Sequence, residues 1–297
     1  MKPCVFTGNC VALATPMYED GSINLEGLTA LIEFVLSGGV DAILVCGTTG
    51  EASTLTAKER EAVIRRAVCV AGGRVPVLVG TGSNDTAHAI EQSQTAQELG
   101  ADALLLVTPY YNKTSQEGLV RHFTAIADAV HLPVILYNVP SRTGVNIQPA
   151  TYRRLADHPR IVATKEANGD LSALTVTRNL CGEDLWIYSG NDDQIVPFFS
   201  LGGIGVISVL ANIRPALVTS ICSLCLSGEI AAAGRLQVQV QPLVSALFSD
   251  VNPIPVKYAL NRMGFAAGPC RLPLVSPAPV VQERLDALLF QGGEDKT

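Results

Sequence analysis

Eight short apolar runs recur along the chain, and this recurrence most limits the folds that the sequence can adopt. Each run is rich in Val, Ile, Leu or Ala and ends near a Gly, Pro, Asn or Thr. Such runs are typical of strands that are buried on both faces of a parallel sheet. The runs are CVALATP (10–16), DAILVCGTTG (41–50), VPVLVGTG (75–82), DALLLVTPYY (102–111), LPVILYNVP (132–140), IVATKEA (161–167), LWIYSGND (185–192) and GVISVLAN (205–212).

Stretches with the apolar spacing of amphipathic helices separate these runs, for example LEGLTALIEFVLSGG and TAHAIEQSQTAQELGA. Thr56 and Glu59 are spaced as a capping box, which predicts a helix start, and the glycines of SGGV and ELGA predict helix ends. Strand and helix alternate at intervals of about 20 to 35 residues. Eight strand–helix units predict an α/β fold of the (β/α)8 (TIM) barrel type.

A doubly wound sheet is the competing α/β arrangement, and it usually carries a G-x-G-x-x-G turn after its first strand. Here the first run ends in ATP and continues as MYEDGSINLEG, so this turn is absent from the sequence. After residue 212 the alternation stops and helical patterns follow. We therefore predict a catalytic barrel over residues 1–228, a C-terminal helical domain over 229–297, and a disordered GGEDKT tail.

Charge and hydropathy narrow the class of function. The formal net charge of the 297 residues is −6 and the pI is near 5.3, which argues against a nucleic-acid or anionic membrane surface. No run reaches the roughly 18 to 20 apolar residues that a membrane span needs. The start, MKPCVFTGNCVALATP, lacks the apolar core of a signal peptide. We expect a cytoplasmic protein that acts on small molecules.

The eight cysteines and four histidines do not form a recognisable metal set. Cys222 and Cys225 have C-x-x-C spacing, but they lie in the apolar stretch LVTSICSLCLSG, without a second pair or a nearby histidine. A chain of this size does not need disulfides to fold, and several cysteines lie within apolar runs. We therefore expect buried free thiols and no metal site.

Polar and reactive side chains follow the predicted strands. Active sites of (β/α)8 barrels lie at the C-terminal ends of the strands, so residues at these positions are candidates for binding and catalysis. We therefore predict an active site that draws on this set: Thr48, Thr49, Tyr110, Tyr111, Tyr137, Asn138, Arg142, Lys165, Glu166, Ser189, Gly190 and Asn191.

Lys165 is the central candidate. A single lysine usually extends into solvent, but these neighbours predict that Lys165 faces the mouth of the barrel. A neutral amine attacks a carbonyl carbon and forms a Schiff base, and burial or a nearby cation such as Arg142 favours the neutral form. The Arg142 guanidinium also suits a carboxylate, and GTTGE (47–51) offers hydroxyl and N–H groups to a small anion. Tyr137 is placed to transfer a proton, directly or through Thr48.

Several motifs in order resemble one family. The motifs after the second and the fourth to seventh predicted strands are GTTGE, PYYN, YNVPSRTG, KEANGD and SGND; GVISV lies at the eighth strand, and NPIPVKYAL comes later. Together they are similar to the 4-hydroxy-tetrahydrodipicolinate synthase (dihydrodipicolinate synthase) family, from about residue 5 to about residue 280. This family lies within the superfamily of pyruvate-dependent class I aldolases and N-acetylneuraminate lyases.

The resemblance implies a role for each group. Lys165 forms a Schiff base with pyruvate, and Thr48 and Thr49 hold the pyruvate carboxylate. Tyr137, Thr48 and Tyr111 form a proton relay, in which Tyr111 reaches the active site of a neighbouring subunit.

The resemblance also implies the second substrate and the assembly. Arg142 binds the carboxylate of L-aspartate-4-semialdehyde, while Gly190 and Ile207 line the pocket through their backbone carbonyls. The product is 4-hydroxy-tetrahydrodipicolinate, on the route to diaminopimelate and lysine. The family needs no organic cofactor and no catalytic metal, and the implied assembly is a homotetramer, as a dimer of dimers, or a homodimer.

Two alternatives stay open. Other pyruvate-dependent lyases of the superfamily, such as N-acetylneuraminate lyase and 2-keto-3-deoxygluconate aldolase, share the lysine, the threonine pair and the tyrosine. Arg142 within YNVPSRTG favours the carboxylate of a short amino-acid aldehyde over the hydroxyls of a sugar acid. A barrel that binds keto acids without catalysis is the second alternative, because a fold alone does not define a function.

The sequence departs from lysine-inhibited relatives at the regulatory site. Asn84 and Tyr110 are retained, but His88 stands at the acidic position, and Ala57 and Arg60 stand at the two candidate histidine positions. A ligand ammonium would meet no carboxylate there and would be repelled by a guanidinium. We predict weak or absent inhibition by lysine.

Overall fold

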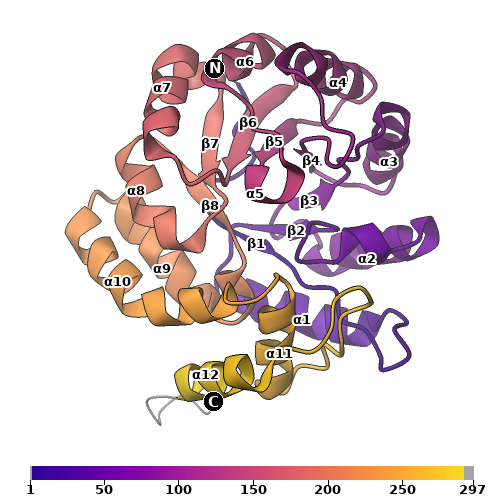
Figure 1. Cartoon of the computed structure of the whole chain (residues 1–297), viewed down its shortest axis with the longest axis vertical. Coiled ribbons are helices and arrows are strands. Elements are labelled where there is room, and N and C mark those ends of the chain that lie inside the picture. Colours follow the sequence, from indigo (N-terminus) through magenta and orange to yellow (C-terminus); the bar gives the residue numbers. More distant parts are fainter. Residues whose placement is uncertain (1, 291–297) are drawn as a thin grey trace.

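The computed structural model describes residues 2–290. Eight parallel strands form a closed barrel in chain order, β1 to β8, which confirms the predicted (β/α)8 fold (Figure 1). The strands are β1 (Gly8–Ala12), β2 (Ala42–Val45), β3 (Val77–Gly80), β4 (Ala103–Val107), β5 (Val134–Asn138), β6 (Ile161–Glu166), β7 (Trp186–Ser189) and β8 (Gly205–Ser208).

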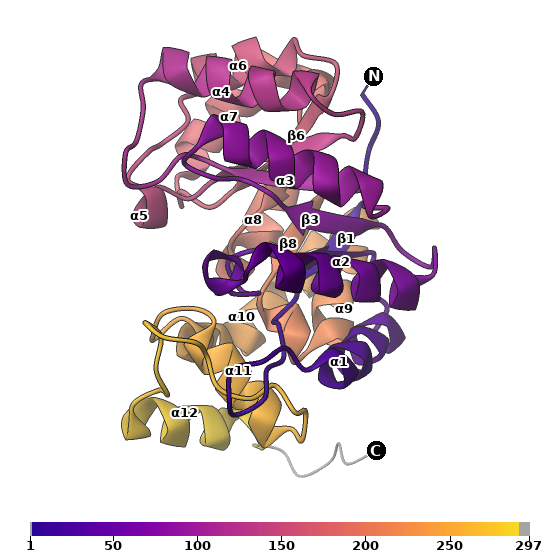
Figure 2. The ribbon, with the colours of Figure 1, turned by 90° about the vertical axis from the view of Figure 1, so that its right-hand side faces the viewer.

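Helices follow the strands and surround the barrel (Figures 1 and 2). The α-helices are α1 (Leu25–Ser37), α2 (Ala57–Ala71), α3 (Thr86–Glu98), α4 (Gln116–Asp128), α5 (Pro140–Thr143), α6 (Pro149–Ala156), α7 (Leu171–Cys181), α8 (Ile195–Ser200), α9 (Pro215–Leu226), α10 (Ile230–Leu247), α11 (Ile254–Arg262) and α12 (Pro279–Leu289). Short 3₁₀ helices are η1 (Ala52–Thr54), η2 (Gly182–Asp184), η3 (Asp192–Gln194) and η4 (Leu210–Asn212).

Two apolar clusters follow the alternation of side chains along the strands. Inside the barrel, Leu44, Leu105 and Ile207 pack with Tyr137 and Tyr188. The residues next to them along each strand face the helices and form a larger outer core. Because Tyr137 belongs to the inner cluster, its side chain faces the barrel interior and not the surrounding helices.

The sequence signals for helix ends are confirmed. The hydroxyl of Thr56 accepts a hydrogen bond from the backbone N–H of Glu59, whose side chain accepts from the N–H of Thr56. Gly39 and Gly100 follow α1 and α3 with φ of 78° and 88°, a backbone conformation that costs glycine little. The Thr56 cap therefore marks the end of the loop after β2, and the two glycines lie in the turns that lead into β2 and β4.

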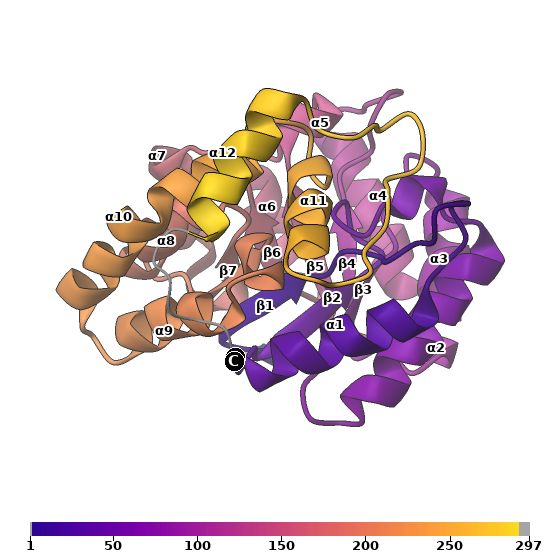
Figure 3. The same cartoon turned by 90° about the horizontal axis from the view of Figure 1, so that it is seen from below.

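The three C-terminal helices gather beside α1 and α9, away from α4 and α6 (Figures 2 and 3). Helix α10 packs against α8 and α9, and residues of α10 to α12 join the outer core of the barrel. The division into domains at residue 228 therefore stays a prediction, since the core runs across it. The predicted disorder of the GGEDKT tail concerns positions outside the described residues.

The cysteines of the described chain are free thiols. Cys222 and Cys225 are buried in α9, whereas Cys4 and Cys69 are exposed, so burial holds for several thiols and not for all. Within residues 2–290 no three His, Cys, Asp or Glu side chains gather as a metal site would require. None of the helices described is long and apolar enough to cross a membrane.

Candidate active site

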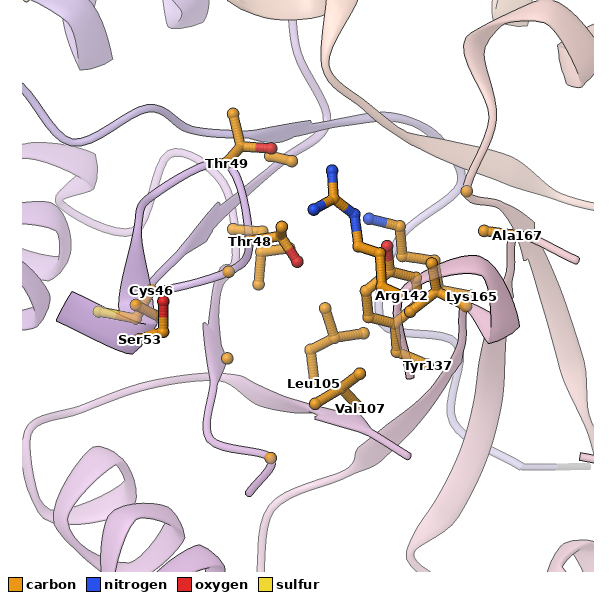
Figure 4. A pocket seen from close by; sticks show the side chains of 18 of the residues that line it. Cys46, Thr48, Thr49, Ser53, Leu105, Val107, Tyr137, Arg142, Lys165 and Ala167 are labelled. Carbon is orange, nitrogen blue, oxygen red and sulfur yellow. The ribbon is translucent and has the colours of Figure 1, made fainter. Parts of the chain in front are cut away.

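A cavity of about 570 Å³ opens at the C-terminal ends of the strands. Eight residues of the predicted set line it, namely Thr48, Thr49, Tyr110, Tyr137, Arg142, Lys165, Gly190 and Asn191. In Figure 4 the side chains of Lys165, Tyr137 and Arg142 point toward Thr48 across the cavity. The fold therefore brings together groups from the ends of β2, β5, β6 and β7.

Lys165 and Tyr137 are direct neighbours across two strands. They are paired in the register of β5 and β6, so their side chains lie side by side on the inner face of the barrel. Nζ of Lys165 lies 4.3 Å from the centroid of the Tyr137 ring, and Lys165 and Tyr137 are 5% and 8% exposed. The Lys165 side chain therefore faces the cavity and not bulk solvent. This agrees with the orientation that the residues at the strand ends predicted.

Gly190 leaves room for the lysine. A Cβ at position 190 would lie 3.2 Å from Cε of Lys165 and 2.7 Å from Cβ of Ala167. The latter distance is shorter than ordinary carbon contacts, so a larger residue at the end of β7 would displace the groups around the lysine side chain.

The GTTGE loop begins directly after β2. Cys46 and Glu51 both have φ of 54°, so the chain turns sharply at each end of the loop. The backbone N–H of Glu51 donates to the carbonyl of Thr48 (3.1 Å). The carboxylate of Glu51 accepts from Nζ of Lys257 in α11 (2.8 Å), and both side chains are buried. A buried ion pair thus attaches the loop to the C-terminal helices.

Arg142 lies in α5, which begins at Pro140 and ends at Thr143, with Gly144 as the capping residue. Its Nη2 donates to the backbone carbonyl of Asn252 (3.2 Å). Nδ2 of Asn252 in turn donates to Oγ1 of Thr49 (3.0 Å). One residue from the C-terminal region therefore contacts both groups that were predicted to bind carboxylates.

Asn252 and Lys257 were not predicted as site residues. The only signal was their presence in the NPIPVKYAL motif, which carries no local indication of a role. They reach the loop from 203 and 206 residues away along the chain, and sequence spacing does not reveal such contacts.

Asn138, Glu166 and Ser189 of the predicted set do not line the cavity, and neither do Tyr111 and Ile207. Tyr111 is 92% exposed and has φ of 67°, a rare backbone conformation for a residue with an aromatic side chain. Ile207 is buried within β8 and packs in the inner cluster. The roles of Tyr111 and Ile207 stay predictions.

Glu166 follows Lys165 and lies on the opposite face of β6, where it is 4% exposed. Its carboxylate accepts hydrogen bonds from the Asn138 amide (3.0 and 3.1 Å), the Tyr152 hydroxyl (2.8 Å) and the Asn168 N–H (3.0 Å). Burial raises the pKa of Glu166 to about 7, although these hydrogen bonds oppose the shift.

Asp192 is a second buried carboxylate near the strand ends. It accepts from the Ser208 hydroxyl (2.5 Å) and from the N–H groups of Val209 (3.0 Å) and Leu210 (2.9 Å), and burial raises its pKa. It attaches the turn after β7 to the end of β8, and this structural role has no counterpart among the sequence predictions.

Together, the fold and these groups define a class of protein: a (β/α)8-barrel enzyme with a lysine amine in its cavity. The model of the dihydrodipicolinate synthetase family matches residues 5–291. The chain therefore belongs to this family.

Comparisons with individual proteins agree with this family assignment. The chain is 51% identical over 290 residues to the 4-hydroxy-tetrahydrodipicolinate synthase of Thermoanaerobacter sp. (strain X514), covering 97% of each chain. A solved dihydrodipicolinate synthase from Acinetobacter baumannii, complexed with pyruvate, is 43% identical with a TM-score of 0.94, over 95% of this chain and 97% of that one. A monomeric dihydrodipicolinate synthase variant is 40% identical with a TM-score of 0.94, over 96% of each chain.

Proposed function

We propose that this protein condenses pyruvate with L-aspartate-4-semialdehyde to give 4-hydroxy-tetrahydrodipicolinate, through a Schiff base on Lys165. The observation that carries the proposal is the buried Lys165 amine beside Tyr137, in a cavity that Thr48, Thr49 and Arg142 also line. The relatives named as 4-hydroxy-tetrahydrodipicolinate synthases, at about half identity over nearly the whole chain, support it.

Lys165 serves as the nucleophile in this proposal. Its neutral amine attacks the keto carbon of pyruvate, and the resulting carbinolamine loses water to leave a protonated imine. The imine accepts electron density, so the methyl carbon of pyruvate loses a proton and becomes a nucleophilic enamine carbon. Tyr137 is close enough to the amine to take part in these proton transfers, with Thr48 and Tyr111 completing the relay.

Thr48 and Thr49 bind the pyruvate carboxylate. The loop that carries them offers hydroxyl groups at the cavity wall, and Asn252 holds the Thr49 side chain by a hydrogen bond. Arg142 binds the carboxylate of the second substrate, since a guanidinium pairs with a carboxylate through two parallel hydrogen bonds. The backbone carbonyls of Gly190 and Ile207 complete the pocket.

The second half of the reaction releases the lysine. The enamine carbon attacks the aldehyde carbon of L-aspartate-4-semialdehyde, and the aldehyde oxygen takes a proton and becomes a hydroxyl group. The amino group of the aldehyde substrate then attacks the imine carbon, which closes the ring and expels the Lys165 amine. No oxidant or reductant is consumed in these steps.

The active assembly is a homotetramer, built as a dimer of dimers, or a homodimer that acts in the cytoplasm. The exposed Tyr111 supports association, because its proposed role requires a second subunit whose cavity it completes. The abundance of free thiols supports a reducing compartment.

The first experiment measures pyruvate-dependent consumption of L-aspartate-4-semialdehyde by the pure protein, coupled to the reductase that consumes the product. Lys165→Ala is the control, and borohydride reduction with pyruvate traps the imine for mass spectrometry of the peptide that contains Lys165. We expect rapid turnover and a trapped adduct in the parent, and neither in the variant. Trapping without turnover would reject the aldehyde and direct the search to sugar acids. Absence of both would reject the Schiff-base mechanism.

A further inference from the structure

Glu166 is a buried carboxylate for which the proposed mechanism has no use. Among the described residues it forms no ion pair with a Lys, Arg or His side chain. Burying a carboxylate without a cation is unfavourable, and here burial raises its pKa. Glu166 lies next to Lys165 in the sequence, so a function near the active site would account for a carboxylate that is unfavourable to bury.

The partners of Glu166 come from three different segments. Asn138 ends β5, Tyr152 belongs to α6, and Asn168 lies in the loop after β6. All three donate a hydrogen bond to the carboxylate, which accepts from each as an anion. The carboxylate therefore joins the ends of β5 and β6 from the outer face of the barrel.

The contact between Glu166 and Asn138, on the outer face of the barrel, is adjacent to the pair of Tyr137 and Lys165 on the inner face. The register of the two strands pairs Tyr137 with Lys165 and, one residue later, Asn138 with Glu166. The backbone repeats the connection, because the N–H of Ala167 donates to the carbonyl of Asn138 (2.9 Å). A shift of β5 against β6 would separate the tyrosine from the lysine, and the Glu166 contacts resist such a shift.

We propose that Glu166 is a positioning residue, which holds Tyr137 beside Lys165 by joining the ends of β5 and β6. The inference rests on the proposed function, since it assigns a role in the same reaction. Glu166 does not contact the substrate, and it acts through the two strands.

Protonation of Glu166 provides a readout that a purely structural role would not change. A protonated carboxyl carries its own donor, which then faces donors from Asn138, Tyr152 and Asn168. Tyr152 is the titratable group that contacts the carboxylate; Lys165 lies on the other face of β6, and the remaining partners are uncharged. We therefore expect the rate to fall as pH decreases through about 7, where the pKa of Glu166 lies.

The test compares Glu166→Gln with the parent by kcat, kcat/KM for pyruvate and the pH profile of kcat. Gln keeps the size of the side chain but directs an NH2 group at donors. We expect kcat and kcat/KM for pyruvate to fall about 10- to 100-fold, because small misplacements of reacting groups have effects of this size. The acid limb near neutral pH should disappear.

A double variant tests whether the hydrogen bond between positions 138 and 166 still joins the strands when its donor and acceptor are exchanged. In the double variant Asn138→Asp/Glu166→Gln, the amide introduced at position 166 donates to the new carboxylate at position 138, so the two strand ends are joined again. We expect this double variant to be several-fold faster than Glu166→Gln alone. A general loss of stability would instead accumulate over two substitutions.

Tyr152→Phe covers the case in which Glu166→Gln fails to fold. It removes one hydrogen bond that lowers the pKa of Glu166 and keeps the ring, so the acid limb should move to higher pH. Asp41→Asn is the matched control, since Asp41 accepts from the Asn9 N–H at the opposite end of the barrel (2.8 Å) and its pKa is also raised by burial. This control should keep the acid limb of the parent.

The possible results separate the proposals. Trapping of pyruvate on Lys165 in the parent tests the proposed function, whereas the ratio of variant to parent rates tests Glu166. Rates of Glu166→Gln within twofold of the parent, with the acid limb intact, would overturn the positioning role. So would an equal loss of rate in Asp41→Asn.

Discussion

Because burial raises the pKa of Glu166 from 4.5 to about 7, the folded state holds this proton at a pH where the unfolded chain has released it. The contribution of Glu166 to stability is therefore greatest below about pH 4.5 and falls as pH rises toward 7. The difference is roughly 3 to 4 kcal/mol, since one pKa unit corresponds to about 1.4 kcal/mol.

We predict that Glu166→Gln removes this part of the pH dependence. In the variant, the free energy of unfolding should decrease less between about pH 5 and about pH 8 than it does in the parent. Urea unfolding of both proteins at the same protein concentration measures the difference, since assembly changes apparent stability. Parallel pH profiles of unfolding for the two proteins would contradict the raised pKa.

The response to lysine is a second prediction at the scale of single residues. His88 is exposed and lies 3.5 Å from Glu91, and Arg60 donates to the carbonyl of Gly80 (2.5 Å). Both residues line the cavity, where a ligand ammonium would meet the Arg60 cation.

We expect lysine to inhibit weakly or not at all in the coupled assay. A sub-millimolar inhibition constant would show that the ammonium finds an acceptor in spite of these substitutions. His88→Glu, which adds a carboxylate at the position in question, should strengthen inhibition if the site is otherwise intact. The unrelated surface variant Glu98→Gln serves as a control.

At the scale of elements, the sequence predicted what depends on local patterns. Each of the eight strands could be predicted because buried parallel strands are apolar runs bounded by turn residues. Lys165 and Tyr137 could be named as site candidates because they lie at the ends of such runs. The predicted runs are longer than the strands; β2 ends at Val45, before the sharp turn at Cys46.

The contacts made by α11 and the loop before it could not be predicted in the same way. Asn252 and Lys257 acquire their roles only when the C-terminal helices pack against the barrel and meet the GTTGE loop. No short-range pattern encodes a hydrogen bond between residues about 200 positions apart. The proton-binding network of Glu166 likewise depends on α6 packing over β6.

The Glu51–Lys257 pair gives a prediction about the coupling between these elements. Lys257→Met leaves the Glu51 carboxylate buried without its ammonium partner, and breaking a buried pair costs about 3–5 kcal/mol. Because Glu51 ends the loop that carries Thr48 and Thr49, the KM for pyruvate should also rise.

The double variant Glu51→Gln/Lys257→Met separates charge from packing. Replacing both charges removes the unpaired ion, so this protein should unfold at a higher urea concentration than Lys257→Met alone. Equal midpoints for the single and double variants would show that the carboxylate is not the source of the instability.

At the scale of the whole molecule, the cavity within one chain lacks one of its proposed catalytic groups, Tyr111. The cavity holds the lysine, the inner tyrosine, the threonine pair and the guanidinium, whereas Tyr111 is almost fully exposed. Its positive φ directs the chain through a rare conformation, and such strain is kept where the surroundings or a function require it. The proposed assembly accounts for both observations if Tyr111 enters the cavity of a neighbouring subunit.

Mixing two inactive variants tests this assembly. Lys165→Ala lacks the nucleophile and Tyr111→Phe lacks the hydroxyl, so each should be slow alone. If subunits exchange Tyr111, a mixed dimer contains one site with both native groups, and random reassociation of equal amounts restores about a quarter of the parental sites. The coupled assay measures this gain after the variants are dissociated and reassembled together. Activity no greater than the mean of the two variants would place Tyr111 outside the neighbouring site, and the relay would then have to be completed within one chain.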